Sequence, residues 1–119
     1  MELKTVKKQF NEILKNSGVC DAENNVNKIL MHVLNINKAT LLITNFISAK
    51  NFKKAKKLVL KRAKHFPLQY LLKQVEFCGN TIFVNKNLLI PRNETEQLCD
   101  MVFKTAENKT VLDLCCGSG

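Results

Sequence analysis

The residues best suited to chemistry lie at the end of the chain. Residues 111–119 read Val-Leu-Asp-Leu-Cys-Cys-Gly-Ser-Gly, an apolar run interrupted by one aspartate and followed by small residues. This pattern is typical of a buried parallel strand that opens onto a ligand-binding loop. Gly117 and Gly119 lack a Cβ atom, so the backbone there can turn tightly and approach a ligand closely. Asp113 suits a ligand that presents a cation beside an amino acid group.

Other kinds of site are disfavoured. The five cysteines form no C-x-x-C pair and have no histidine at ligand spacing, so we expect free thiols rather than a metal site or a disulfide framework. The terminal loop lacks the G-x-x-x-x-G-K-[ST] spacing that grips the phosphates of ATP or GTP. No apolar run approaches the ~20 residues that cross a bilayer, and the first ten residues hold no signal core. We therefore expect a cytoplasmic protein that does not bind membranes.

Apolar residues at helical spacing predict a small bundle of four or five helices that must support this loop. The first helix covers residues 2–16, and Asp21, Asn37 and Ser48 are placed to cap the next three. Pro67 suits the first turn of a short fifth helix over residues 68–72.

After Lys73 the apolar pattern changes from helical to alternating. Apolar residues flank Gly79-Asn80, which predicts a hairpin with its tight turn at these two residues. Asn93 and Glu96 then have the spacing of a capping box, which predicts a helix that continues to residue 106. A strand is expected to begin near Thr110. Because this strand has no neighbour in the chain, we expect the last ten residues to be loosely packed on the preceding helix.

The net charge of +9 indicates an acidic partner more than a nucleic acid. Eight basic residues and no acid lie between residues 50 and 64, which describes either a solvated helix face or a docking surface for an anion. Arginine, which makes the planar contacts to bases and phosphates, occurs only as Arg62 and Arg92.

Four segments together resemble the HemK/PrmC methyltransferases. They are Phe-Pro-Leu-Gln-Tyr-Leu-Leu at 66–72, Glu-Phe-Cys-Gly at 76–79, Leu-Ile-Pro-Arg-Asn-Glu-Thr-Glu at 89–96, and the terminal residues 111–119. That family transfers a methyl group from S-adenosylmethionine to the amide nitrogen of the glutamine in the Gly-Gly-Gln loop of peptide chain release factors.

The resemblance implies a mainly α protein, a small helical bundle followed by a β-hairpin linker and the first strand of an incomplete Rossmann-like α/β methyltransferase domain. The helical substrate-recognition domain would cover residues 1–73, the hairpin linker 74–91 and the beginning of the Rossmann-like domain 92–119. The sequence departs from the family pattern where Lys73 and Cys115 replace glycines and Asn93 replaces a proline.

The resemblance also implies which residues bind S-adenosylmethionine. They are Arg92, Thr95, Glu96, Asp113, Cys115, Cys116, Gly117, Ser118 and Gly119. The capping box explains Glu96 equally well without a ligand. No catalytic or metal-binding residue is assigned, because the Asn-Pro-Pro-Tyr motif that holds the substrate glutamine in this family does not occur in the 119 residues.

These features favour the N-terminal portion of a release factor glutamine methyltransferase, with a release factor as its protein partner. We expect a monomer that has no catalytic activity by itself. Two alternatives remain open. One is a non-catalytic binding module for a release factor or a nucleic acid, and the other is a ribosomal-protein glutamine methyltransferase, which would share the cofactor loop.

Overall fold

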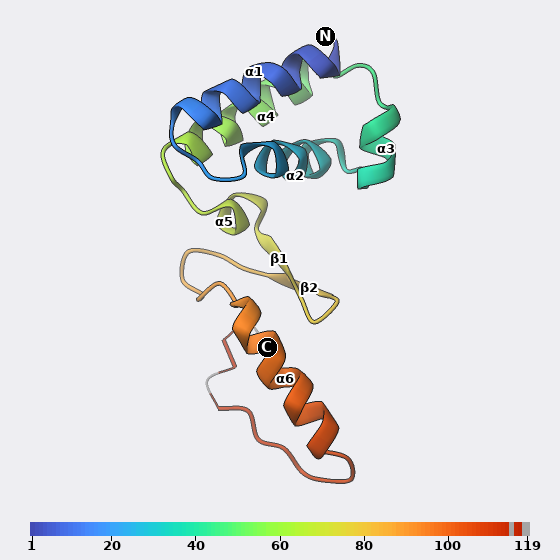
Figure 1. The fold of residues 1–119 in the computed structure, drawn as a ribbon, viewed down its shortest axis with the longest axis vertical. Helices are drawn as coiled ribbons and strands as arrows, with labels where there is room; N and C mark the ends of the chain where they lie inside the picture. The colour runs from blue at the N-terminus through green and yellow to red at the C-terminus, as the bar shows by residue number, and fades with distance from the viewer. Residues whose placement is uncertain (115, 118–119) are drawn as a thin grey trace. The chain divides into compact units, whose positions relative to one another are not determined.

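The computed structural model describes residues 1–114, 116 and 117, and the chain divides into two compact units, Met1–Leu72 and Lys73–Gly119 (Figure 1). The first unit contains helices α1 (Leu3–Asn16), α2 (Ala22–Leu34), α3 (Lys38–Ile43), α4 (Ala49–Ala63) and α5 (Leu68–Leu72). The second contains strands β1 (Gln74–Phe77) and β2 (Asn80–Phe83) and helix α6 (Asn93–Thr105). The expected fold class, mainly helical with a β-hairpin after the helices, is confirmed. None of the helices in the described part combines the length and the apolar character that a bilayer crossing demands.

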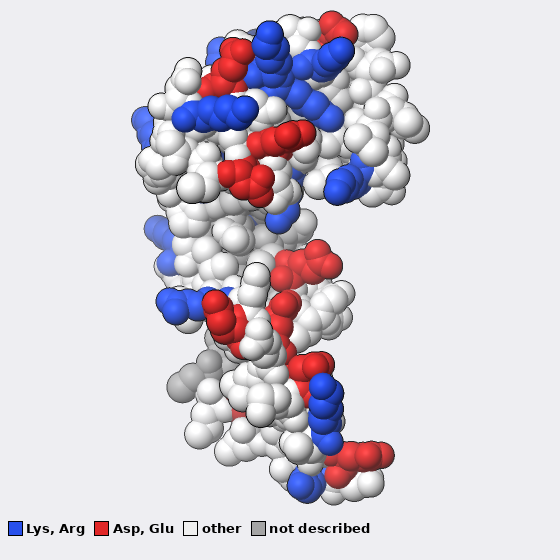
Figure 2. Space-filling model, viewed as in Figure 1, with Lys and Arg blue, Asp and Glu red and all other residues white. Residues whose placement is uncertain are grey.

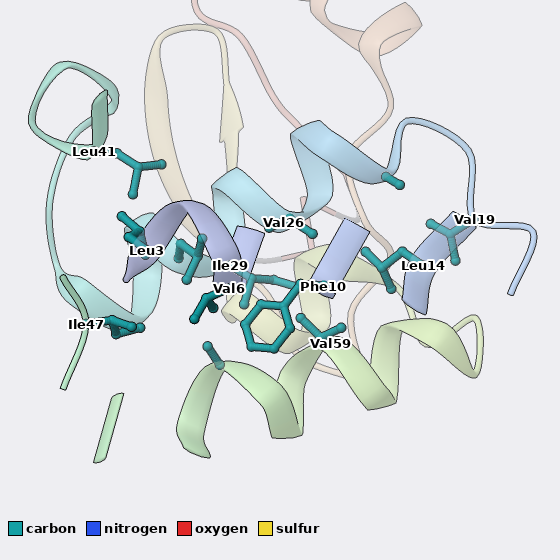
Figure 3. Packing of buried hydrophobic residues seen from close by; sticks show 13 residues of the cluster. Leu3, Val6, Phe10, Leu14, Val19, Val26, Ile29, Leu41, Ile47 and Val59 are labelled. Carbon is teal, nitrogen blue, oxygen red and sulfur yellow. The ribbon is translucent and has the colours of Figure 1, made fainter. Parts of the chain in front are cut away.

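Helix α1 supplies the centre of the core in the helical unit. Its residues Leu3, Val6, Phe10 and Leu14 are at most 1% exposed, and their spacing places them on one face of the helix. Helices α1, α2 and α4 each pack against the other two, and their side chains meet around Phe10 (Figure 3). The Phe10 ring stacks on that of Phe52 from α4, with ring centroids 5.6 Å apart. The three helices therefore close one core within the first unit.

Backbone hydrogen bonds tie the segment before α4 to the start of α1. The Leu3 N–H donates to the carbonyl oxygen of Asn45 (2.8 Å), and the Ile47 N–H donates to that of Met1 (2.9 Å). The amino group of Met1 in turn donates to the Ile47 carbonyl oxygen (3.0 Å). These bonds hold the connection after α3 so that Leu41 and Ile47 are buried in the same cluster as α1.

A single buried polar side chain links α2 to α4. Asn25 is 8% exposed, and its Nδ2 donates to the backbone oxygens of Asp21 (2.8 Å) and Cys20 (3.3 Å). Its Oδ1 accepts a hydrogen bond of 2.8 Å from Nε of Arg62 on α4. Because both ends of the amide are bonded, the burial cost of Asn25 is offset, and the turn before α2 is fixed to α4.

Two of the three predicted helix caps form, and the third does not. The side chains of Asn37 and Ser48 each accept a hydrogen bond from the backbone N–H three residues later, at 2.8 and 3.2 Å. Asp21 precedes α2 as expected, but it makes no side-chain cap, so that prediction is wrong. Its backbone lies in the left-handed region (φ 52°), and its carboxylate instead accepts a bond of 2.9 Å from Asn24.

The hairpin of the second unit turns one residue earlier than predicted. Strands β1 and β2 are antiparallel and Phe77 pairs with Asn80, so the two-residue loop is Cys78–Gly79 and not Gly79–Asn80. Both loop residues have positive φ angles, 47° for Cys78 and 74° for Gly79. A two-residue turn with positive φ at both positions matches the right-handed twist of the strands, and the observed register places Gly79 at the second position, where glycine is preferred.

The strand predicted to begin near Thr110 is absent. Residues 110–114 form no strand, and the side chains of Val111, Leu112 and Leu114 are 58–79% exposed. The described sheet consists only of β1 and β2, so no neighbour offers the backbone of 110–114 a ladder of hydrogen bonds. Helix α6 likewise has no buried residue, in keeping with the loose packing expected for this region.

We predict that Asn25→Ala lowers the free energy of unfolding by about 1–3 kcal/mol, because it removes the acceptor of the Arg62 Nε–H and the side-chain donor to the Cys20 carbonyl oxygen. The Asp21 carbonyl oxygen keeps the hydrogen bond from the backbone N–H of residue 25 (3.1 Å). Lys28→Ala, at an exposed position on the same helix, is the matched control and should change stability by less than about 0.5 kcal/mol. Urea unfolding of the full chain, followed by circular dichroism, measures both. Equal stability of the two variants would contradict the role given to Asn25.

Candidate functional site

The start of α6 positions the first group of predicted cofactor residues. Arg92, not Asn93, is the N-cap residue, with an extended backbone (φ −100°, ψ 149°) and no side-chain cap. Its carbonyl oxygen accepts a hydrogen bond of 3.0 Å from the N–H of Thr95, and the side chains of both residues are exposed. The predicted capping box between Asn93 and Glu96 is therefore wrong, because Asn93 already belongs to the helix.

A hydrogen bond of the Glu96 side chain links the hairpin loop to α6. Its Oε1 accepts a hydrogen bond of 2.8 Å from the backbone N–H of Cys78. Since Cys78 begins a tight loop, its N–H has no ladder partner in β1 or β2, and the carboxylate satisfies it. The sequence did not predict this bond, because Cys78 and Glu96 are 18 positions apart and no local pattern connects them.

The thiol of Cys78 lies beside the same face of α6. Residues 96, 99 and 100 share this face by their helical spacing. Partial desolvation raises the pKa of the Cys78 thiol, and the neighbouring Cys99 thiol and the carboxylates of Glu96 and Asp100 raise it further. Because a raised pKa leaves little thiolate at neutral pH, Cys78 is poorly suited to act as a nucleophile there. Among the described residues, no three His, Cys, Asp or Glu side chains gather closely enough to hold a metal ion.

The terminal loop, the second group of predicted cofactor residues, is described only in part. Asp113 and Cys116 are exposed, and Gly117 has a φ of 66°, a conformation that favours glycine. Cys115, Ser118 and Gly119 lie outside the described residues. Within the described part of the loop, no hydrogen bond or ion pair joins Asp113, Cys116 or Gly117 to Arg92, Thr95 or Glu96. The described members of the two groups are thus not joined by direct bonds.

A second candidate surface lies on α4. Leu60 is 46% exposed at the centre of five lysines, and together they line a shallow hollow of about 370 Å³. The residues of this surface, which we call the lysine ring, are Lys53, Lys56, Lys57, Leu60, Lys61 and Lys64. Over the described residues the one ion pair joins Lys104 to Asp100 in α6, so no described carboxylate forms an ion pair with a lysine of the ring. By contrast, basic and acidic side chains are interspersed over the face of the helical unit seen in Figure 2.

A comparison with protein-family models finds a match for the helical unit. Residues 5–72 match the family model described as the PrmC N-terminal domain, which is more than half of the chain. The chain therefore belongs to the PrmC family, as the resemblance of its motifs predicted. The matched residues coincide with the unit that closes its own core, Met1–Leu72.

Curated relatives match more of the chain than the family model does. A protein of Mycoplasma mycoides subsp. mycoides SC named release factor glutamine methyltransferase is 32% identical over 111 residues, which is 89% of this chain and 39% of the relative. Proteins with the same name from Leptospira interrogans and Borreliella burgdorferi are 31% and 38% identical over 97% and 76% of this chain, and over 42% and 34% of their own length. The chain thus spans about two fifths of the length of the relatives it matches.

We predict that Glu96→Gln speeds alkylation of Cys78 by iodoacetamide at mildly alkaline pH. The substitution removes one of the negative charges that raise the Cys78 pKa, so the thiolate forms at a lower pH, while the amide oxygen can still accept the Cys78 N–H. Mass spectrometry of the peptides gives the rate against pH, with the exposed Cys20 as the internal reference.

Glu94→Gln is the matched control, since Glu94 also lies in the first turn of α6 but is not among the groups that raise the Cys78 pKa. An alkylation profile of Cys78 that shifts equally in both variants would show that Glu96 has no specific influence on the thiol.

Proposed function

We propose that this chain is the N-terminal portion of a release factor glutamine methyltransferase and that its helical unit recognises the release factor. The observation that carries the proposal is the match of residues 5–72 to the PrmC N-terminal domain, together with the names of the relatives. A unit that completes its own core can present a fixed surface to a partner without help from the rest of the chain. In this proposal the protein acts in the cytoplasm as a monomer on a protein substrate.

The remaining residues would supply the beginning of the cofactor site. The positive φ of Gly117 and the exposed carboxylate of Asp113 fit a loop that approaches a cationic ligand closely. We assign the binding of S-adenosylmethionine to Asp113 and residues 115–119, with further contacts from Arg92, Thr95 and Glu96. Glu96 uses one carboxylate oxygen on Cys78 and keeps the other for a ligand. S-adenosylmethionine, when bound, supplies a methyl group on a sulfonium that a nucleophile can attack in line.

The proposed reaction also needs groups that these residues do not provide. The nitrogen of a glutamine amide is a weak nucleophile because its lone pair is delocalised into the carbonyl group. Methyl transfer to it requires fixed acceptors for its N–H groups and a geometry that excludes water. In the family these acceptors come from the Asn-Pro-Pro-Tyr motif, which the 119 residues do not contain.

We predict that the purified chain binds a release factor through its helical unit. In a titration followed by NMR, amide signals of residues 1–72 should shift on addition of release factor, whereas those of Val111–Leu114 should not. An unrelated acidic protein of similar charge is the control for non-specific attraction. If no signal moves at about 100 µM release factor, the Kd is weaker than that concentration and the proposed recognition role is wrong.

We also predict that the 119 residues alone transfer no methyl group. Incubation with a release factor and S-adenosylmethionine labelled in the methyl group should leave the glutamine unlabelled, since the acceptors for its N–H groups are missing. A full-length relative serves as the positive control. A labelled glutamine in the release factor would show that these 119 residues themselves supply the acceptors for its N–H groups, and the prediction would be wrong.

A further inference from the structure

We propose that the lysine ring of α4 is the surface that docks the protein partner, and that it takes an acidic segment which places an apolar side chain on Leu60. The identity of that partner as a release factor rests on the proposed function above. The inference adds which face of the helical unit makes the contact and which chemistry recognises it.

First, the ring lysines repel one another and form no ion pair with a described carboxylate. The favourable contact among them is that of Lys56, whose Nζ lies 6.0 Å from the centroid of the Phe52 ring. Lys53, Lys57 and Lys61 follow one another at four-residue spacing, an arrangement in which like charges destabilise a helix. Helix α4 has no acidic residue in its first turn, where an acid would complement the helix dipole. Burial of Ala55 and Val59 on the opposite face holds the helix in place despite this repulsion.

The second argument comes from the apolar centre of the ring. Leu60 lies three or four positions from Lys56, Lys57 and Lys64, so the lysine stems surround its exposed side chain. A segment that offers carboxylates around one apolar side chain would complement this arrangement in both charge and hydrophobicity.

The third argument favours a protein over a nucleic acid. The one arginine and the one aromatic side chain of α4 are engaged with other parts of the helical unit. Arg62 donates to Asn25 and to the Phe66 carbonyl oxygen (3.3 Å), and the Phe52 ring stacks on Phe10. The lysine ring therefore offers neither an arginine guanidinium group nor an unengaged aromatic side chain. Nucleic-acid-binding surfaces commonly use both, the guanidinium group on phosphates and the aromatic side chain on bases.

The test compares charge reversals on two helices of the full chain. One variant carries Lys53→Glu, Lys57→Glu and Lys61→Glu in the ring. The matched control carries Lys4→Glu, Lys8→Glu and Lys15→Glu at exposed positions of α1, which changes the net charge equally. Circular dichroism verifies that both fold. Calorimetric titration with release factor should show at least a tenfold weaker Kd for the ring variant and less than about a threefold change for the control.

A second pair of variants tests the apolar centre. Leu60→Ser should weaken binding about threefold to tenfold, whereas Leu42→Ser, at a more exposed apolar residue on α3, should not. If Leu60→Ser binds like Leu42→Ser, the apolar contact is wrong.

The outcomes separate this inference from the proposed function. Equal affinities of the ring variant and the α1 control would overturn the inference while the chain still binds release factor. Absence of binding by the unaltered chain would overturn the proposed function and this inference with it. If the ring variant keeps its affinity for release factor but no longer retards single-stranded RNA in a gel, the ring is a nucleic-acid surface and the inference is wrong.

Discussion

The burial of one face of α1 between α2 and α4 is the interaction on which the rest of the structure depends. Phe10 is fully buried, and the residues one helical turn before and after it complete an apolar stripe that both neighbouring helices cover. Full burial of a side chain of this size contributes on the order of 2 kcal/mol or more, which is large beside the marginal stability of a domain. The same packing orients α4, so that its apolar residues face inward and its lysines face outward. Recognition of a partner would thus depend on the core, because the core decides which side of α4 is exposed.

The second unit has no comparable source of stability. Its described contacts are a two-stranded hairpin, a hydrogen bond from Cys78 to Glu96 and a helix without a buried side chain. An isolated hairpin is marginal in water, and an amphipathic helix gains most of its stability from packing. Among the described residues of this unit only Val84 is buried, while the side chains of Leu98, Met101 and Leu112 are exposed. The two units thus differ in how much apolar surface they bury.

The sequence predicted the features that depend on local periodicity and missed those that depend on distant partners. The helices of the first unit follow from apolar spacing, and the caps at Asn37 and Ser48 follow from side chains that bond three residues away. Asp21 failed as a cap because its backbone is left-handed and not extended, and its carboxylate accepts a bond from the Asn24 side chain instead. Glu96 failed as a capping-box residue because the loop at Cys78, 18 residues earlier, offered it a free N–H. The strand expected near Thr110 needs neighbours that no local pattern supplies.

Native-state amide exchange of the 119-residue chain tests most directly whether the helical unit holds its structure by itself. The account predicts that the slowest amides belong to α1, α2 and α4 and exchange only by global unfolding, while those of α6 and of Val111–Leu114 exchange by local opening at much lower free energy. Equal protection of α6 and α1 would contradict the account, since it would mean that both units share one cooperative core.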